Sequence, residues 1–141
     1  MTSFLLDTNT LSDIANDAPG WERIVGKIAL YGIHRCAISA ITWHELRFGR
    51  IDGEGKVSKE RLAAMDAAYG LYEILPFDAD AAAEAVTVRV TLRKIGKPIG
   101  LPDILIAGHA LAADRVMITA NVREFGRVPG LKVEDWTAQA P

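Results

Sequence analysis

The sequence predicts a three-layer α/β/α fold around a mostly parallel central sheet. Short apolar runs alternate along the chain with longer segments of helical periodicity, which is the pattern of a parallel sheet covered by helices on both faces. The chain has 141 residues and no internal repeat, low-complexity segment or proline-rich linker. We therefore expect a single domain over residues 1–141 with one compact core.

The first expected elements are two strands, each followed by a helix. Phe4–Leu6 is a short apolar run that ends at Asp7, so we expect a buried strand and a helix that starts immediately after it. A second buried strand is expected at Cys36–Ser39. Helical spacing then runs over Ile41–Phe48, and Gly49 marks the expected end of that helix.

The middle of the chain adds two helices and one edge segment. Ser58 is a good N-cap for a helix over Lys59–Tyr72. Ile74–Phe77 follows as an extended segment at the edge of the sheet, where its proline is tolerated. We expect Asp80 to cap the alanine-rich helix that comes next and ends at Ile95.

The last third of the chain returns to the sheet. Pro102 suits the first turn of a helix that runs to Ala113, and this places Asp103 beside the helix N-terminus. Val116–Thr119 is the next expected buried strand. Leu131–Glu134, after a proline–glycine turn, is the expected last strand.

Composition and charge exclude several classes of protein. Cys36 is the only cysteine, which excludes an intrachain disulfide and a cysteine-based metal cluster. The sequence has no signal-peptide pattern and no apolar run long enough to span a bilayer, so we expect a cytoplasmic protein that does not enter membranes. The net charge of −2 argues against binding nucleic acid through overall positive potential, but it leaves a nuclease open. The three histidines lack zinc-hydrolase spacing and are interpreted as packing or surface residues.

Polar and acidic side chains gather at the expected carboxyl ends of the strands. They are Asp7 after the first strand, Glu45 after the second, Asp103 at a later helix start, and Asn121 and Glu124 after the next strand. In a parallel α/β fold, residues far apart in sequence converge at this edge. Oxygen ligands of this kind suit Mg²⁺ or Mn²⁺, which activate water for phosphodiester hydrolysis.

These residues also have purely structural interpretations. Asp7 suits the N-cap of the helix that follows it. Thr42 and Glu45 have the spacing of a capping box, in which the glutamate bonds to a backbone N–H instead of a metal. Asp103 suits the first turn of a helix, where a negative charge favours the helix dipole. The two polar residues after the later strand are common in turns. Spacing alone leaves both interpretations open.

Four stretches of the chain carry a resemblance to a known family. They are Phe4–Asn9, Ile38–Gly49, Asp103–Ala110, and Ile118–Phe125 with its continuation through Val128–Leu131 and Glu134–Trp136. In order, spacing and full-length coverage the chain resembles the PIN-domain nucleases, specifically the VapC-type toxins of toxin–antitoxin pairs and their FitB-like relatives. The resemblance implies a PIN-like fold and a Mg²⁺-dependent endoribonuclease.

The resemblance also implies a role for each matching residue. Asp7 and Asp103 are expected to bind the metal directly. Glu45 is expected to hold a metal-bound water or a second ion. Thr8 and Asn9 are expected to orient Asp7.

The fourth corner of the implied site departs from the family pattern. The position of Asn121 is an aspartate in many relatives, and an amide binds metal without adding charge. Glu124 is a candidate for the compensating carboxylate; alternatively, a second ion binds weakly until RNA phosphates help to hold it. Arg47 and Arg50 are candidates for RNA contacts, against the simpler interpretation that they are solvated charges at a helix end.

Partners follow from the same resemblance. A VapB/FitA-like antitoxin is expected to block the acidic groove, with an arginine presented to the carboxylates. A homodimer is expected, with Ala64–Tyr72 as a candidate surface, and so is a higher assembly with antitoxin and DNA. The expected substrate is structured RNA, including tRNA, cleaved by water to leave a 5′-phosphate and a 3′-hydroxyl.

Two other functions stay open from the sequence. An aspartate-dependent phosphatase would form an aspartyl-phosphate, but its common version has a second acid where this chain has Asn9. The other alternative is a PIN-fold binding module that is catalytically weak or inactive. Asp7, Glu45 and Asp103 speak against it, because crowded carboxylates without a cation repel one another.

Overall fold

The computed structural model describes residues 1–53 and 55–139, and its centre is a parallel sheet. Within these residues five strands pair in the order β3-β2-β1-β4-β5, and every pairing is parallel. The strands are β1 (Phe4–Leu6), β2 (Cys36–Ser39), β3 (Glu73–Leu75), β4 (Val116–Ile118) and β5 (Val133–Glu134). The expected parallel sheet is confirmed.

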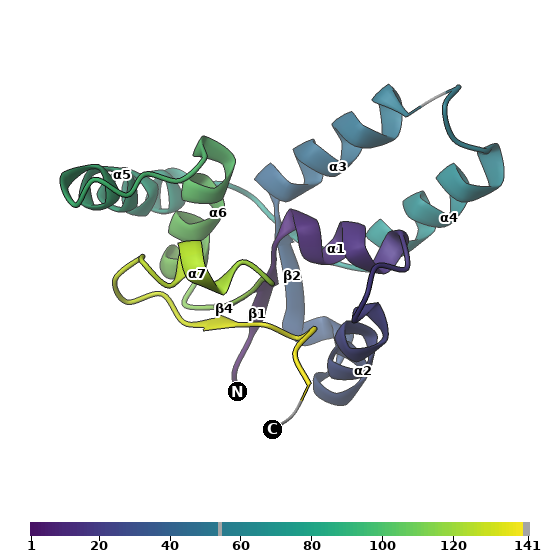
Figure 1. Ribbon diagram of the computed structural model, residues 1–141, viewed down its shortest axis with the longest axis horizontal. Coiled ribbons are helices and arrows are strands. Elements are labelled where there is room, and N and C mark those ends of the chain that lie inside the picture. Colours follow the sequence, from purple (N-terminus) through teal and green to yellow (C-terminus); the bar gives the residue numbers. More distant parts are fainter. Residues whose placement is uncertain (54, 140–141) are drawn as a thin grey trace.

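Helices cover both faces of this sheet, and α3 and α4 project away from it as a hairpin (Figure 1). Helices α1 and α2 pack on one face, joined by Leu46 of α3 and Tyr69 of α4, and α5, α6 and α7 pack on the other. In the described residues they are α1 (Thr8–Ala15), α2 (Trp21–Tyr31), α3 (Ala40–Asp52), α4 (Lys59–Tyr69), α5 (Ala79–Lys94), α6 (Leu101–Ala112) and α7 (Val122–Phe125), with a 3₁₀ turn at Ile33–Arg35. None of these helices is long and apolar enough to cross a membrane. The three-layer prediction is confirmed.

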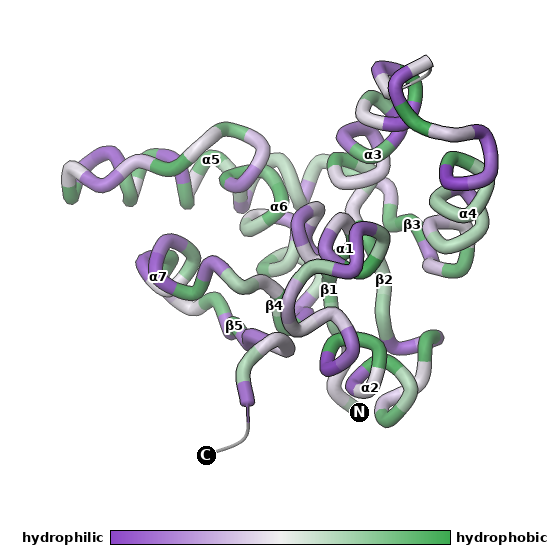
Figure 2. The backbone as a smooth tube through the Cα atoms, turned by 45° about the vertical axis from the view of Figure 1, so that its right-hand side comes forward, coloured by the Kyte–Doolittle hydropathy of each residue, from purple (hydrophilic) through white to green (hydrophobic). Residues whose placement is uncertain are grey.

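Alternate residues of the central strands point into two separate cores. Phe4 and Leu6 pack with helices α1 and α2, whereas Leu5 between them packs with α5 and α6. Figure 2 shows hydrophobic residues along β1 and β2, between the two groups of helices. Because both faces are buried, such strands have continuous apolar sequences instead of an alternating pattern.

Helices α5 and α6 approach each other closely at Gly108. A Cβ atom at this position would lie 2.4 Å from the backbone nitrogen of Ala85, which is far inside van der Waals contact. The missing side chain therefore lets the two backbones meet and buries Ala107 and Ala110 against α5 and the sheet. This contact fixes α6, whose first turn carries Asp103.

Two helix boundaries differ from those expected. Asp78 caps α5, because its Oδ1 accepts a hydrogen bond from the Ala81 N–H at 2.9 Å. Asp80 lies inside the first turn, so its prediction as the cap is wrong. Helix α3 continues through Gly49 to Asp52, so the predicted end at Gly49 is also wrong. A glycine stops a helix only when the chain turns there, and Gly49 keeps helical geometry.

Four other elements differ in extent or were not predicted. Helix α4 ends before Gly70, short of the expected Tyr72, and β3 starts at Glu73, ahead of the expected extended segment. Strand β5 is shorter than the predicted segment. Helix α2 was not predicted, because its N-cap is Gly20, which has φ 91° and offers no side-chain hydrogen bond.

Candidate active site

The candidate site lies at the carboxyl edge of the sheet, at the point where the strand order reverses. From β1 the chain moves outward to β2 and β3 on one side, and later to β4 and β5 on the other. Ligands of open α/β sheets bind at such a switch point. Asp7 directly follows β1, and its backbone N–H donates to the Ile118 carbonyl at 3.0 Å. The first candidate acid therefore lies between the two central strands.

Asp7 is a buried carboxylate that caps a helix and has a raised pKa. Its side chain is 3 % exposed, and Oδ1 accepts a hydrogen bond from the Thr10 N–H at 2.8 Å, which caps α1. Burial raises the pKa of its carboxyl group, while hydrogen bonds from Thr10 and Thr119 oppose that increase. The capping interpretation is therefore correct, but it does not account for placing the acid almost out of contact with water.

Glu45 is held by a hydroxyl group and not by a capping box. Helix α3 is capped by Ser39, whose Oγ accepts from the Ile41 N–H at 3.1 Å, so Glu45 lies in the second turn. The capping-box interpretation of Thr42 and Glu45 is therefore wrong. The Thr8 hydroxyl donates to Glu45 Oε1 at 2.6 Å, and the buried Thr42 Oγ1 lies 3.3 Å from Thr8 Oγ1.

Asp103 shows that acids from separate elements come together. It lies in the first turn of α6 beside Pro102, as expected. Burial, together with the negative charges of Asp7, Glu45 and Glu124, raises the pKa of its carboxyl group to about 6. An exposed acid at a helix start has no such neighbours. Residues from the end of β1 and from α3, α6 and α7 therefore share one negative region.

The fourth corner of the site contains an amide and a carboxylate that bond to each other. Asn121 Nδ2 donates to Glu124 Oε2 at 2.8 Å, and the Asn121 backbone N–H donates to Thr119 Oγ1 at 3.0 Å. Of these two candidates, Glu124 is the one whose charge reaches Asp103.

The two residues next to Asp7 lie differently from the sequence expectation. Thr8 directs its hydroxyl group to Glu45, and the hydrogen bonds to Asp7 come from Thr10 and Thr119 instead. Asn9 is exposed, and its side chain makes no hydrogen bond within residues 1–53 and 55–139. The expected orientation of Asp7 by its two neighbours is therefore wrong, because α1 begins at once and turns both side chains away.

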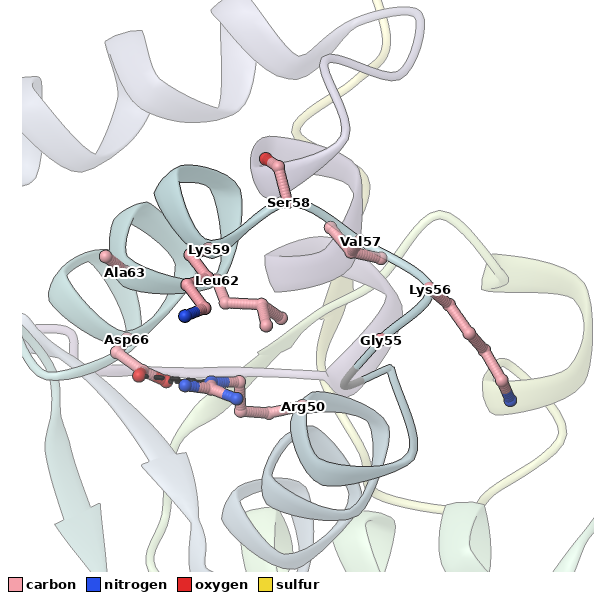
Figure 3. A pocket seen from close by; sticks show the side chains of 9 residues that line it. All are labelled: Arg50, Gly55, Lys56, Val57, Ser58, Lys59, Leu62, Ala63 and Asp66. Carbon is pink, nitrogen blue, oxygen red and sulfur yellow. Dashed lines mark hydrogen bonds and ion pairs between the residues drawn. The ribbon is translucent and has the colours of Figure 1, made fainter.

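The two candidate arginines lie along α3 beyond Glu45. The Arg47 guanidinium lies 5.7 Å from the centre of the Trp43 ring. Arg50 forms an ion pair with Asp66 of α4 at 3.1 Å. Figure 3 shows this pair inside a pocket of about 840 Å³ between α3 and α4, lined also by Lys56 and Leu62. This pocket contains none of the candidate acids, so the structure does not bring Arg50 to them.

The donor atoms suit a hard divalent cation. Asp7, Glu45, Asp103 and Glu124 offer carboxylate oxygens, the ligands that Mg²⁺ prefers. Across the described ranges, no three His, Cys, Asp or Glu side chains converge tightly enough to enclose an ion by themselves. Mg²⁺ is usually held by one or two carboxylates and keeps several waters, so this looser arrangement fits it.

Sequence reasoning missed the hydroxyl groups that hold the acids. Thr10 and Thr119 bond to Asp7, and Thr42 lies against Thr8. Thr119 had a usable signal, since it directly follows the Val116–Ile118 strand at the same edge as Asp7. The other two contacts depend on the exact start of a helix, which the sequence does not give.

Comparisons with known proteins agree with this geometry. Residues 4–131 match the family model described as PIN domain. The tRNA(fMet)-specific endonuclease VapC of Salmonella typhimurium is 38 % identical over 137 residues, which cover 96 % of this chain and 99 % of that protein.

Solved structures give the same result. A chain in the crystal structure of DNA-bound VapBC from Salmonella typhimurium has a TM-score of 0.85 and 36 % identity, covering 96 % of this chain and 99 % of that one. A chain in a toxin–antitoxin complex from Klebsiella pneumoniae has a TM-score of 0.71 and 25 % identity, covering 95 % and 98 %. This chain belongs to the PIN-domain family and, within it, to the VapC ribonucleases.

Proposed function

We propose that this chain is the toxin of a type II toxin–antitoxin pair and acts as a Mg²⁺-dependent endoribonuclease. The observation that carries the proposal is the mutual approach of Asp7, Glu45, Asp103 and Glu124, whose charges add to the effect of burial in raising the pKa of Asp103 to about 6. Such crowding is unfavourable in the free chain and becomes favourable when a cation neutralises it. Membership of the VapC ribonucleases supports RNA as the substrate class.

The candidate acids have different roles in hydrolysis. Asp7 and Asp103 would hold the cation, each fixed at the start of a helix. Mg²⁺, or Mn²⁺ in its place, activates water and neutralises charge on the scissile phosphate when bound. Glu45, with Oε1 held by Thr8, orients the attacking water for in-line displacement. The products are a 5′-phosphate and a 3′-hydroxyl, and the RNA 2′-hydroxyl is not the nucleophile.

Glu124 is our choice for the fourth acid. Asn121 stands where many relatives have an aspartate, and its amide donates to Glu124 Oε2. In this assignment Asn121 does not bind the cation directly but keeps the glutamate turned toward Asp103. The chain thereby retains four negative charges at the site.

The proposed partners follow from the relatives and from the acidic site. The DNA-bound VapBC relative supports a cognate VapB/FitA-like antitoxin and a larger assembly on DNA. An antitoxin arginine is suited to block the acidic site, because its planar guanidinium pairs with carboxylates in two parallel hydrogen bonds. We also propose a cytoplasmic homodimer, with structured RNA such as tRNA as the substrate.

Cleavage of unfractionated tRNA by the purified chain tests this function. We expect cuts at few positions in the presence of Mg²⁺, loss of cleavage with EDTA, and recovery when Mg²⁺ is restored. Sequencing of the cut ends should show 5′-phosphates. Cleavage that survives EDTA, or ends that carry 2′,3′-cyclic phosphates, would contradict the proposed mechanism.

The two earlier alternatives have less support. A catalytically inactive PIN-fold module predicts no cleavage and no stabilisation by Mg²⁺, so the same preparation separates it from a nuclease. An aspartate-dependent phosphatase needs a second acid where this chain has Asn9, and Asn9 is exposed on α1. Membership of the PIN-domain family also disfavours it.

A further inference from the structure

Ser39 and His109 form a buried hydrogen bond that the proposed mechanism does not use. His109 Nδ1 lies 2.8 Å from Ser39 Oγ, across a sequence separation of 70 residues. Ser39 is 0 % exposed and His109 is 4 % exposed. A polar pair this deeply buried is expensive unless its geometry is well satisfied, so its position in the fold is informative.

This bond joins the two helices that carry Glu45 and Asp103. Ser39 ends β2 and caps α3, and Glu45 lies in the second turn of that helix. His109 belongs to α6, whose first turn carries Asp103. The contact therefore lies where the direction of α3 is set, and it attaches that point to α6.

The donors and acceptors of the pair are consistent with a neutral imidazole. Ser39 Oγ accepts the Ile41 N–H, so its own proton is available for His109 Nδ1, which leaves the imidazole proton on Nε2. Burial lowers the pKa of His109, Asp78 opposes that change, and Arg115 reinforces it. The imidazole is therefore neutral near pH 7 and able to accept this bond.

A second contact fixes the orientation of the imidazole ring. Phe77 meets His109 edge to face, with ring centres 5.4 Å apart and an interplanar angle of 87°. An aromatic contact of this kind restricts rotation of the imidazole. Nδ1 is thus held toward Ser39 by packing as well as by hydrogen bonding.

We propose that His109 is a positioning residue that acts through Ser39 to set the separation of Glu45 and Asp103. Thr8 holds the carboxylate of Glu45 directly, while the buried pair holds the start of its helix. The inference rests on the proposed function, because this separation matters only when both acids serve one cation. Outer partners of this kind typically change metal affinity or activity by about 10- to 100-fold.

The test compares His109→Phe with His109→Asn in the full chain. Phenylalanine keeps the aromatic contact and removes Nδ1, whereas the asparagine Oδ1 can still accept the Ser39 proton. Mn²⁺ affinity is measured by calorimetry without RNA, and kcat and KM are measured on unfractionated tRNA. We expect His109→Phe to weaken Mn²⁺ binding and kcat by about 10- to 100-fold with little change in KM, and His109→Asn to restore most of both. His34→Phe, at an exposed histidine, is the control.

Ser39→Ala and the double variant Ser39→Ala/His109→Phe complete a double-mutant cycle for Mn²⁺ affinity. If His109 acts through Ser39, the double variant loses no more Mn²⁺ affinity than the worse single variant. Unchanged Mn²⁺ affinity in His109→Phe, failure of asparagine to rescue it, or additive losses would each overturn the inference. If His109→Phe does not fold, Ser39→Ala decides: weaker Mn²⁺ binding supports the inference, and parental binding overturns it.

The tautomer of His109 can be read independently of activity. Nitrogen-15 NMR of the metal-free parent should show an unprotonated Nδ1, and a protonated Nδ1 would overturn the hydrogen-bond assignment. A parent chain that shows this tautomer but neither binds Mn²⁺ nor cuts tRNA would refute the proposed function. An active parent with equally active variants would refute only the positioning role.

Discussion

Helix α6 belongs to two regions of opposite physical character. Its first turn places Asp103 beside three other acids, which raise the pKa of its carboxyl group together with burial. Its middle packs Gly108 directly onto Ala85 and buries apolar residues on both sides. The first region keeps charges together at a cost in stability, and the second, apart from the buried His109, stabilises the fold by apolar packing. Activity and stability should therefore respond to different substitutions.

The largest effect is expected from Asp7→Asn, which should separate the two properties. Asparagine caps a helix as well as aspartate does, so α1 keeps its cap while the site loses one negative charge. We expect tRNA cleavage to fall by about 10²- to 10³-fold with the melting temperature kept or raised. Initial rates and thermal unfolding on one preparation measure both, and parental cleavage would remove Asp7 from the mechanism.

Leu92→Ala, in the packed region, should lower stability and leave activity unchanged. Leu92 is 0 % exposed and lies in the core between α5, α6 and the sheet. Its truncation should lower the free energy of unfolding by about 2–5 kcal/mol. The cleavage rate per folded molecule should be unchanged, as measured at a temperature where denaturant curves show full folding. A large loss of activity in the folded variant would mean that the two regions are coupled.

Asp103→Asn should raise the free energy of unfolding of the metal-free chain, by less than Leu92→Ala lowers it. The folded-state pKa of about 6 exceeds the ordinary value of 3.8, so the folded chain binds this proton more tightly than the unfolded chain. The resulting destabilisation is absent below about pH 4 and complete above about pH 6. At neutral pH the substitution should therefore stabilise the metal-free chain by about 1 kcal/mol, after allowance for solvent screening.

Its control is Asp80→Asn, at an exposed acid in the first turn of α5. Denaturant unfolding at acidic and neutral pH, with EDTA present, compares the two variants. The gain should appear only in Asp103→Asn and only at the higher pH. An equal gain in both variants would mean that Asp103 is an ordinary surface charge.

The smallest effect is expected at Cys36, which lies in the core on the other face of the sheet and should react slowly with a thiol reagent. Its thiol is 0 % exposed, and burial raises its pKa to about 11, so the reactive thiolate is scarce at neutral pH. A thiol reagent should label the native chain slowly and the denatured chain rapidly. Rapid native labelling would show that this core opens readily.

Sequence predicted the strands and the first acids because they depend on local patterns. Phe4–Leu6 is apolar on both faces and ends in Asp7, which suffices to place a buried strand and an acid at its carboxyl end. The residues that cap the helices were harder to predict. Asp78 and Asp80 are equally good N-caps by type, and only the exact turn of the chain selects Asp78.

Contacts between distant elements could not be predicted from local patterns. The bond between Ser39 and His109 joins β2 to α6, and neither residue signals the other in the sequence. The same is true of the hydroxyl of Thr8, which reaches Glu45 because α1 and α3 start side by side at the sheet edge. The acids were visible in sequence, whereas their supports required the fold.

Thermal unfolding with and without Mn²⁺ tests most directly whether the four acids form one cation site. At a hundredfold excess over its Kd, a ligand of the folded state adds about 2.7 kcal/mol of stability. The parent and Asp80→Asn should therefore melt several degrees higher with Mn²⁺, whereas Asp103→Asn should start higher and gain little. A parent chain that Mn²⁺ does not stabilise, or an Asp103→Asn variant stabilised as much as the parent, would contradict the account.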